Sequence, residues 1–180
     1  MESKPVSRLE MSLHWTIAAG IVGLIGLGLF MSETRSFSLY DIHKSIGLLL
    51  FMIIAVRVVV RLNKGWPESI SDGPAWEHVV ARFVHWALIL GTVIMPLSGL
   101  LDALMSGQGL SIFALELVAG NPGENGRPQA LNEGLAEMAE EVHHYTGYAL
   151  IAAIVLHVAG ALKHHLVDGD NTLRRMVGRS

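Results

Sequence analysis

The segment 142–162 reads VHHYTGYALIAAIVLHVAGAL and contains no Asp, Glu, Lys or Arg. A helix needs about 20 mainly apolar residues to cross a hydrocarbon core of roughly 30 Å, so this stretch predicts a transmembrane helix. His143 and His157 lie 14 residues apart in it. That spacing is about 40° short of four full turns and corresponds to a rise of about 21 Å. We therefore expect both imidazoles on one face of this helix, near opposite membrane surfaces.

Three further segments are also long and apolar enough to predict transmembrane helices. Residues 11–32 and 83–101 carry no charged side chain. The segment 43–62 contains Arg57 and Arg61, but both lie in its last two turns, where long cationic side chains reach the membrane interface. The fold predicted from these segments is an all-α membrane protein, a four-helix bundle forming a single membrane-embedded domain over residues 1–180. Its transmembrane helices are expected over residues 11–31, 43–62, 77–104 and 140–166.

The composition agrees with a membrane location. Of the 180 residues, 51% are hydrophobic and 16% are charged, whereas roughly a quarter of the residues in soluble domains are charged. The absence of cysteine excludes disulfides, thiolate metal sites and the covalent attachment of a c-type heme. The formal net charge of −3 gives no indication of a nucleic-acid partner, which would need a basic patch.

Basic residues are distributed unequally between the two sides of the predicted bundle. If the N-terminus is cytoplasmic, the basic residues on the outer side are Arg35, Lys44 and Arg127. Because cytoplasmic flanks are enriched in Lys and Arg, both termini are predicted to be cytoplasmic. The basic residues on that inner side are Lys4, Arg8, Arg57, Arg61, Lys64, Arg82, Lys163, Arg174, Arg175 and Arg179.

The longest predicted connection is the outer segment 106–140. It is rich in Gly, Pro and Asn between residues 120 and 128, which predicts a loop, and we expect one short surface helix over residues 110–118. The segment is also acidic. The carboxylates of this segment, together with that of Glu141 directly after it, are Glu116, Glu124, Glu133, Glu137, Glu140 and Glu141.

His143 and His157 each have a partner at the same predicted depth. His14 lies near the inner end of the first helix, as His157 does in the fourth, and His43 opens the second helix at the outer surface, as His143 opens the fourth. Two stacked pairs of imidazoles suit two planar macrocycles better than zinc, which generally takes three or four protein ligands per site. We infer two b-type hemes enclosed by the bundle, with inner iron on His14 and His157 and outer iron on His43 and His143. Bis-histidine iron has no vacant position, so these sites are expected to carry single electrons.

Other residues compete for these roles. His144 is adjacent to His143 and remains an alternative ligand of the outer heme iron, although the 14-residue spacing between His143 and His157 favours His143. Met52 and Met95 are axial ligands in principle, but both lie at mid-membrane without matching partners, which favours a packing role.

Cationic residues near the inner histidine pair are candidates for the heme propionates and for a quinone site. Arg57, which lies 14 residues after His43, and Arg61 are the predicted partners of the inner propionates. A lipid-soluble quinone is expected beside the inner heme, because its reduction takes up protons as well as electrons and histidines can supply them. The residues predicted to line the quinone site are His85, His164, Lys163 and Arg82.

Several short segments carry a family resemblance that covers nearly the whole chain. They include Ser12-Leu13-His14-Trp15, Ile42-His43-Lys44-Ser45-Ile46-Gly47, Pro96-Leu97-Ser98-Gly99 and Lys163-His164-His165. In this order and spacing the chain resembles the bacterial cytochrome b561 family of four-helix di-heme membrane cytochromes. The resemblance implies heme ligation by the two histidine pairs named above and quinone-linked respiratory electron transfer in the bacterial inner membrane. The closing segment, which includes residues 170–176, is similar to the superoxide oxidase branch, which passes electrons from superoxide to ubiquinone.

The function predicted is a membrane di-heme b-type cytochrome that transfers single electrons across the bilayer to or from ubiquinone. Superoxide and a soluble carrier are the two expected donors at the periplasmic face. Superoxide is an anion and the outer loops are mostly acidic, so a basic soluble carrier competes with it. Two alternatives are a cytochrome b anchor subunit of a multi-subunit dehydrogenase or hydrogenase, disfavoured by the short loops, and a heme-free histidine-relay transporter. Polar residues are lacking in the middle of the predicted helices, which disfavours the transporter.

Overall fold

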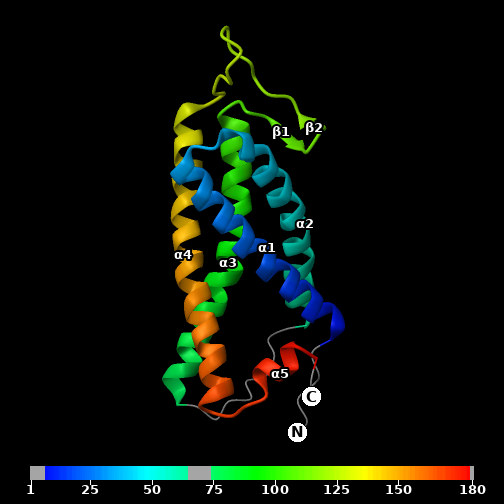
Figure 1. Cartoon of the computed structure of the whole chain (residues 1–180), viewed down its shortest axis with the longest axis vertical. Helices are drawn as coiled ribbons and strands as arrows, with labels where there is room; N and C mark the ends of the chain where they lie inside the picture. Colours follow the sequence, from blue (N-terminus) through cyan, green and yellow to red (C-terminus); the bar gives the residue numbers. More distant parts are fainter. Residues whose placement is uncertain (1–6, 65–73, 179–180) are drawn as a thin grey trace.

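The computed structural model describes residues 7–64 and 74–178, and within these residues it contains four helices long and apolar enough to cross a membrane. They form an elongated bundle (Figure 1), so the predicted four-helix membrane fold is confirmed. The longest has 34 residues, or about 51 Å, and its ends therefore extend beyond the hydrocarbon core. Lys4 and Arg179, which contribute to the charge asymmetry, lie outside the described residues. The four helices are α1 (Arg8–Thr34), α2 (Tyr40–Lys64), α3 (Ala75–Met105) and α4 (Glu133–Leu166).

The ends of two of these helices are specified by local capping. Before α1, the Ser7 hydroxyl accepts a hydrogen bond from the Glu10 amide, and the Glu10 carboxylate accepts one from the Ser7 amide. Arg35 ends α1 in the left-handed region, with φ of 52°. At the start of α4, the Asn132 side chain accepts a hydrogen bond from the Leu135 amide. These contacts satisfy backbone N–H groups that have no partner within the helix.

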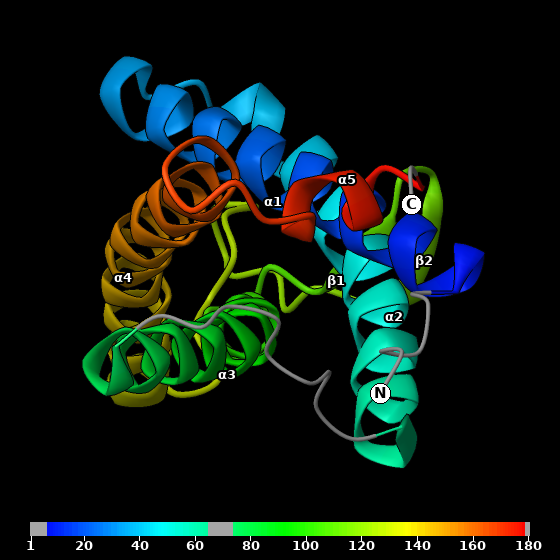
Figure 2. The ribbon, with the colours of Figure 1, turned by 90° about the horizontal axis from the view of Figure 1, so that it is seen from below.

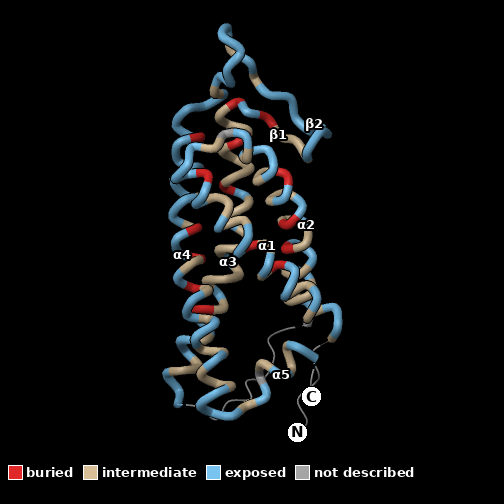
Figure 3. Tube along the Cα trace, in the orientation of Figure 1, coloured by how far each residue is buried: buried red, intermediate tan, exposed pale blue. Residues whose placement is uncertain are grey.

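The four helices pack as two pairs, α3 along α4 and α1 against α2 (Figure 2). Ile17 and Ile21 of α1 form a buried cluster with Leu50 and Ile54 of α2, and Ile154 of α4 packs against it. Most buried positions lie in the middle of the bundle and toward one end (Figure 3). The outer surface of the helices exposes large apolar side chains, as expected for contact with lipid. More than half of the surface of each of Val22, Met52, Phe83 and Val155 is exposed.

Glycines let the helices approach closely at the level of the buried cluster. A Cβ added at Gly91 of α3 would lie 2.7 Å from Cδ2 of Leu150, and one at Gly20 of α1 would lie 2.8 Å from both Cδ atoms of Leu50. Both distances are below van der Waals contact, so only glycine fits without a shift of the leucines. Leu150 and Leu50 are 1% and 6% exposed. Each leucine is thus buried against a glycine of a neighbouring helix.

Residues 110–118 form a β-hairpin, so the expected short helix over this segment was wrong. Strand β1 (Leu110–Ile112) pairs antiparallel with β2 (Leu115–Val118). Phe113 in the turn has φ of 52°, and its amide donates a hydrogen bond of 2.7 Å to Oγ of Ser45 in α2. This contact joins residues 68 positions apart. No local sequence pattern predicts this contact, which holds the turn against α2. We call this end of the bundle the hairpin end.

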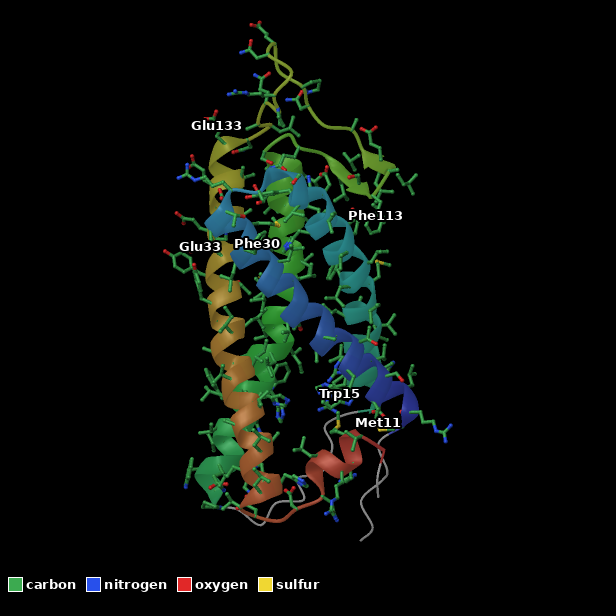
Figure 4. All side chains as sticks on the ribbon, in the orientation of Figure 1. Met11, Trp15, Phe30, Glu33, Phe113 and Glu133 are labelled. Carbon is green, nitrogen blue, oxygen red and sulfur yellow. The ribbon has the colours of Figure 1, made fainter. Side chains whose placement is uncertain are left out.

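A short helix marks the opposite end. Helix α5 (Thr172–Met176) lies across this end of the bundle in Figure 2, and we call it the α5 end. The indole Nε1 of Trp15 in α1 donates a hydrogen bond of 2.8 Å to the carbonyl oxygen of Met176. Figure 4 labels Trp15 and Met11 on α1 close to α5. A groove between α1 and α5 is lined by Arg8, Met11, Ser12, Trp15, Thr16, Met176 and Val177.

Candidate functional site

At the hairpin end, the histidines of α2 and α4 face each other. The ring centroids of His43 and His143 are 6.2 Å apart, with the ring planes at 74°. Nδ1 of His143 lies 2.8 Å from the carbonyl oxygen of Met95 in α3. A carbonyl oxygen can only accept a hydrogen bond, so Nδ1 of His143 carries the proton and Nε2 keeps a free lone pair. This tautomer is the one that binds a metal through Nε2, with the second nitrogen held by a backbone carbonyl.

Gly99 allows the ring of His143 to approach α3. A Cβ at this position would lie 2.9 Å from Cε1 and 3.0 Å from Nδ1 of His143. The Oγ of Ser98 lies 3.3 Å from the same Nδ1 and donates a hydrogen bond of 2.9 Å to the Met95 carbonyl. The ring of His143 is therefore fixed from one side by α3. The sequence analysis did not assign Gly99, Ser98 or the Met95 carbonyl a role at this site, although the first two lie within the segment 96–99 that carries the family resemblance.

A cavity beside the hairpin-end pair extends toward the middle of the bundle. Apart from the two imidazoles its lining is apolar, which suits a hydrophobic planar ligand. The lining residues are Ile21, Leu24, Ile25, His43, Gly47, Leu50, Ile54, Met95, Pro96, His143 and Leu150.

At the α5 end, three histidines meet. The ring centroids of His14 in α1 and His157 in α4 are 6.2 Å apart, with the planes at 69°. The ring of His85 in α3 lies 5.3 Å from that of His157 on centroids, at 67°. The structure thus brings together the predicted inner pair, and it places the quinone-site candidate His85 directly beside it.

The separation of the rings tests whether these pairs fit heme iron. Two metal–nitrogen bonds of about 2.0 Å, with roughly 1.1 Å from each nitrogen to its ring centre, separate the centroids of two axial imidazoles by about 6.2 Å. Both predicted pairs show a centroid separation of 6.2 Å. The donor set of two imidazoles per site also matches the bis-histidine ligation of b-type cytochromes. The residues present therefore fit two hemes.

The guanidinium of Arg57 provides a second test of whether the residues present fit heme. Within the part of the chain that the structure describes, its Nη1 is buried and has no hydrogen-bond partner. Its charge interacts with His14 and His157, and both Arg57 and Arg61 interact with Glu10. A buried guanidinium nitrogen without a hydrogen-bond partner is costly, so the unpartnered Nη1 predicts an anionic hydrogen-bond acceptor close to the inner histidine pair. A heme propionate has this charge.

Two quinone-site candidates at the α5 end belong to a network of ion pairs. Nζ of Lys163 lies 2.6 Å from Oε2 of Glu77 and 3.2 Å from Oδ2 of Asp168. Nδ1 of His164 lies 2.8 Å from the same Asp168 oxygen and 4.0 Å from Oδ2 of Asp170. The hydrogen bond from His164, together with that from Lys163, lowers the pKa of Asp168 below its ordinary value. The Lys163 ammonium lies among these carboxylates, so the cluster is an ion-pair network and not a cation site.

The remaining candidates are placed as follows. Arg82 is exposed, and the ring of His144 lies 6.5 Å from that of His143 on centroids. Because the ring of His143 faces that of His43, His143 is favoured over His144 as the ligand of the outer heme iron. Met52 is 62% exposed and faces away from the bundle, which does not suit an axial ligand. Sequence reasoning missed Glu77 and Asp168, although the four-residue spacing of Asp168 from His164 is visible in the sequence.

Comparison with known proteins identifies the family. The family model described as prokaryotic cytochrome b561 matches residues 6–179. The chain belongs to this family. This cytochrome b561 is therefore a multi-pass bacterial membrane protein that binds b-type heme and takes part in electron transport. Membership disfavours the heme-free transporter considered above.

Three curated relatives match nearly the whole chain. The cytochrome is 31% identical over 180 residues to cytochrome b561 homolog 2 of Escherichia coli K12, covering 96% of this chain and 90% of that protein. It is 26% identical over 178 residues to cytochrome b561 homolog 1 of the same strain, with coverage of 96% and 97%. It is 25% identical over 177 residues to the probable superoxide oxidase CybB of Yersinia pestis, with coverage of 97% and 96%.

Proposed function

We propose that this cytochrome b561 binds two b-type hemes and transfers single electrons across the bilayer between a donor at the hairpin end and ubiquinone at the α5 end. The observation that carries the proposal is the pair of histidine contacts, each with a centroid separation of 6.2 Å. The two α4 histidines are about 21 Å apart along the helix axis, so the sites are separate.

The protein residues would hold each heme from two helices. His43 and His143 would bind the iron at the hairpin end, and His14 and His157 the iron at the α5 end. Arg57 and Arg61 would pair with propionates at the α5 end, which would satisfy the buried Nη1 of Arg57. When bound, each heme supplies an iron that is oxidised and reduced by one electron. The protein fixes the imidazoles, and for His143 it does so through the Met95 carbonyl.

We place the ubiquinone headgroup at the α5 end, where titratable side chains gather near the inner histidine pair. The residues proposed to line it are His85, His164, Lys163 and Arg82. His164 is held by Asp168 through Nδ1, so Nε2 is the ring nitrogen that would take a proton from water and pass it to the quinone. The charge asymmetry of the loops supports a cytoplasmic location for this end and for both termini. Protons for quinone reduction would then come from the cytoplasm.

The donor at the hairpin end is superoxide or a basic soluble carrier. Superoxide is supported by the similarity to the probable superoxide oxidase of Yersinia pestis. The charge on this surface favours the carrier instead. The side chain of Lys44 is only 18% exposed and pairs with Asp41 at 3.3 Å. Arg35 and Arg127 are then the outer cations that remain to steer an anion among many carboxylates.

The heme assignment is tested with single alanine variants of the four ligands. Purified wild-type protein should contain two b-type hemes per chain. His43→Ala and His143→Ala should remove the hairpin-end heme alone, and His14→Ala and His157→Ala the α5-end heme alone. Loss of both hemes from every variant would contradict two separate sites, and an unchanged heme content would contradict the ligand assignment.

The substrates are tested separately by stopped-flow reduction. The holoprotein is mixed with superoxide or with reduced horse-heart cytochrome c, used as a basic carrier, at low and high salt. If the rate of heme reduction by the basic carrier falls as the salt concentration rises, the result supports the carrier as donor, since salt screens the attraction between opposite charges. His164→Gln should keep both hemes but slow ubiquinone reduction. An unchanged rate would place the quinone elsewhere.

A further inference from the structure

The hairpin exposes an unusual amount of apolar surface. Phe113 in the turn is 56% exposed, and in β2 the exposed fractions are 62% for Leu115, 46% for Leu117 and 45% for Val118. Every residue of β2 is exposed. Such a group of large apolar side chains in water would be unfavourable, so contiguous exposure of this kind marks a contact surface.

The depth of the hairpin in the bundle indicates what it contacts. The amide of Phe113 donates its hydrogen bond to Ser45, whose side chain is fully buried in α2. Ser45 lies five residues after Tyr40, where the membrane-spanning helix begins, and this corresponds to about 7.5 Å along the axis. The turn is therefore held beside the second turn of a transmembrane helix. Figure 4 shows Phe113 on the outer side of the bundle, next to α2.

The surface of α2 at the same level is also apolar and exposed. Ile42, Ile46 and Leu49 are 41%, 39% and 44% exposed. These residues belong to a helix that spans the membrane, so they face lipid. A second contact ties the hairpin to this helix, because Nζ of Lys44 donates a hydrogen bond of 3.3 Å to Oε1 of Gln108, just before β1. The hairpin thus continues a lipid-facing surface.

Next to the turn, the strand pairing puts an apolar pair and a polar pair of residues on opposite faces of the hairpin. Ile112 pairs with Leu115, and Ser111 pairs with Glu116. Side chains alternate between the faces of a strand, so the apolar pair and the polar pair point to opposite faces. An element with this pattern suits the boundary between water and acyl chains, where interfacial elements bury their apolar face by about 5–10 Å.

We propose that the β1–β2 hairpin is embedded in the lipid leaflet at the hairpin end, with Phe113 and Leu115 among the acyl chains and Glu116 at the headgroups. The hairpin then anchors the loop next to the hairpin-end histidine pair, since Ser45 follows His43 by two residues.

The test uses the absence of cysteine from the chain. Phe113→Cys, in the full-length protein, is labelled with a nitroxide and placed in lipid nanodiscs that hold one copy. The accessibility of the label to oxygen, which concentrates in acyl chains, is compared with that to a water-soluble nickel chelate. Glu116→Cys provides the matched control on the polar face. Asn125→Cys provides the aqueous control in the exposed loop 121–128.

We expect the ratio of oxygen to nickel accessibility to be roughly ten-fold higher for the label at position 113 than at position 125, because acyl chains exclude the chelate. The label at position 116 should lie between the two. Equal ratios at positions 113 and 125 would show the hairpin in water and overturn the proposal. Low accessibility to both reagents at position 113 would also overturn it, because the turn would then pack against protein.

Discussion

Replacing Gly99 by alanine should weaken the heme site at the hairpin end and leave the other site intact. The added methyl would lie 2.9 Å from Cε1 and 3.0 Å from Nδ1 of His143. Carbon atoms in contact are about 3.5–4.0 Å apart, so the ring would have to move by about 0.6 Å or more. The methyl also approaches the nitrogen that donates to the Met95 carbonyl at 2.8 Å.

The size of the effect follows from two estimates. Overpacking of this kind costs about 1–3 kcal/mol, which corresponds to roughly 5- to 150-fold in a binding constant. Loss of the hydrogen bond that orients a metal-binding histidine lowers affinity by about 10- to 100-fold. A displacement of about 0.6 Å also exceeds the tolerance of roughly 0.2 Å on metal–ligand distances. We therefore expect heme at the hairpin-end site to bind at least about ten-fold more weakly.

Heme content per chain and a potentiometric titration monitored by visible absorbance measure this effect. The variant should fall from two hemes per chain toward one and lose one of two redox components. Gly134→Ala is the matched control, because the nearest atom to its added Cβ, Oδ1 of Asn132, lies 3.8 Å away. Gly134 is an exposed glycine of α4, the helix that carries His143, and its alanine variant should keep both hemes.

Two results would contradict this prediction. If Gly99→Ala keeps two hemes with an unchanged spectrum and unchanged potentials, His143 is not positioned by α3 as described. If it loses both hemes while Gly134→Ala keeps them, the two sites are not independent.

Three further substitutions test contacts that hold the ends of the bundle. Ser45→Ala removes the acceptor of the Phe113 amide, costs about 1–3 kcal/mol locally, and should speed hydrogen exchange of the hairpin amides. Trp15→Phe removes the indole donor to Met176, costs about 0.5–1.5 kcal/mol, and should speed proteolysis within α5. Asp168→Asn should lower the melting temperature at neutral pH. Because the folded-state pKa of Asp168 is lowered, its contribution is present above its ordinary pKa of about 4 and is lost as the pH falls through the lowered value. The difference in melting temperature between wild type and variant should therefore shrink on acidification, and a constant difference would contradict this role.

The sequence predicted the four helices because a bilayer leaves few alternatives. A spanning segment must satisfy its backbone groups internally and remain apolar over about 20 residues, so composition alone locates it. The histidine pairs were predictable for a related reason. Helical periodicity places His143 and His157 on one face, and the depth of each residue in a spanning helix follows from its position in the segment.

The hairpin and the ion-pair network were not predictable in this way. Residues 110–118 are short and partly apolar, and their conformation depends on a hydrogen bond to Ser45 in a distant helix. Likewise, Lys163 meets Glu77 across 86 residues, at the point where the ends of α3 and α4 come together. Neither contact can be recognised from a local sequence pattern, because both depend on how the helices pack.

The sequence was sufficient to predict the membrane location, the helix count and the depth of each histidine, since these depend on the period of a helix and the thickness of a bilayer. Which side chains touch depended on how the helices pack. The tertiary structure placed His143 opposite His43, with Gly99 and the Met95 carbonyl holding the ring, and it brought His85 against His157. The rotation of one helix about its axis relative to the next is set by side-chain packing, and helical periodicity carries no information about it.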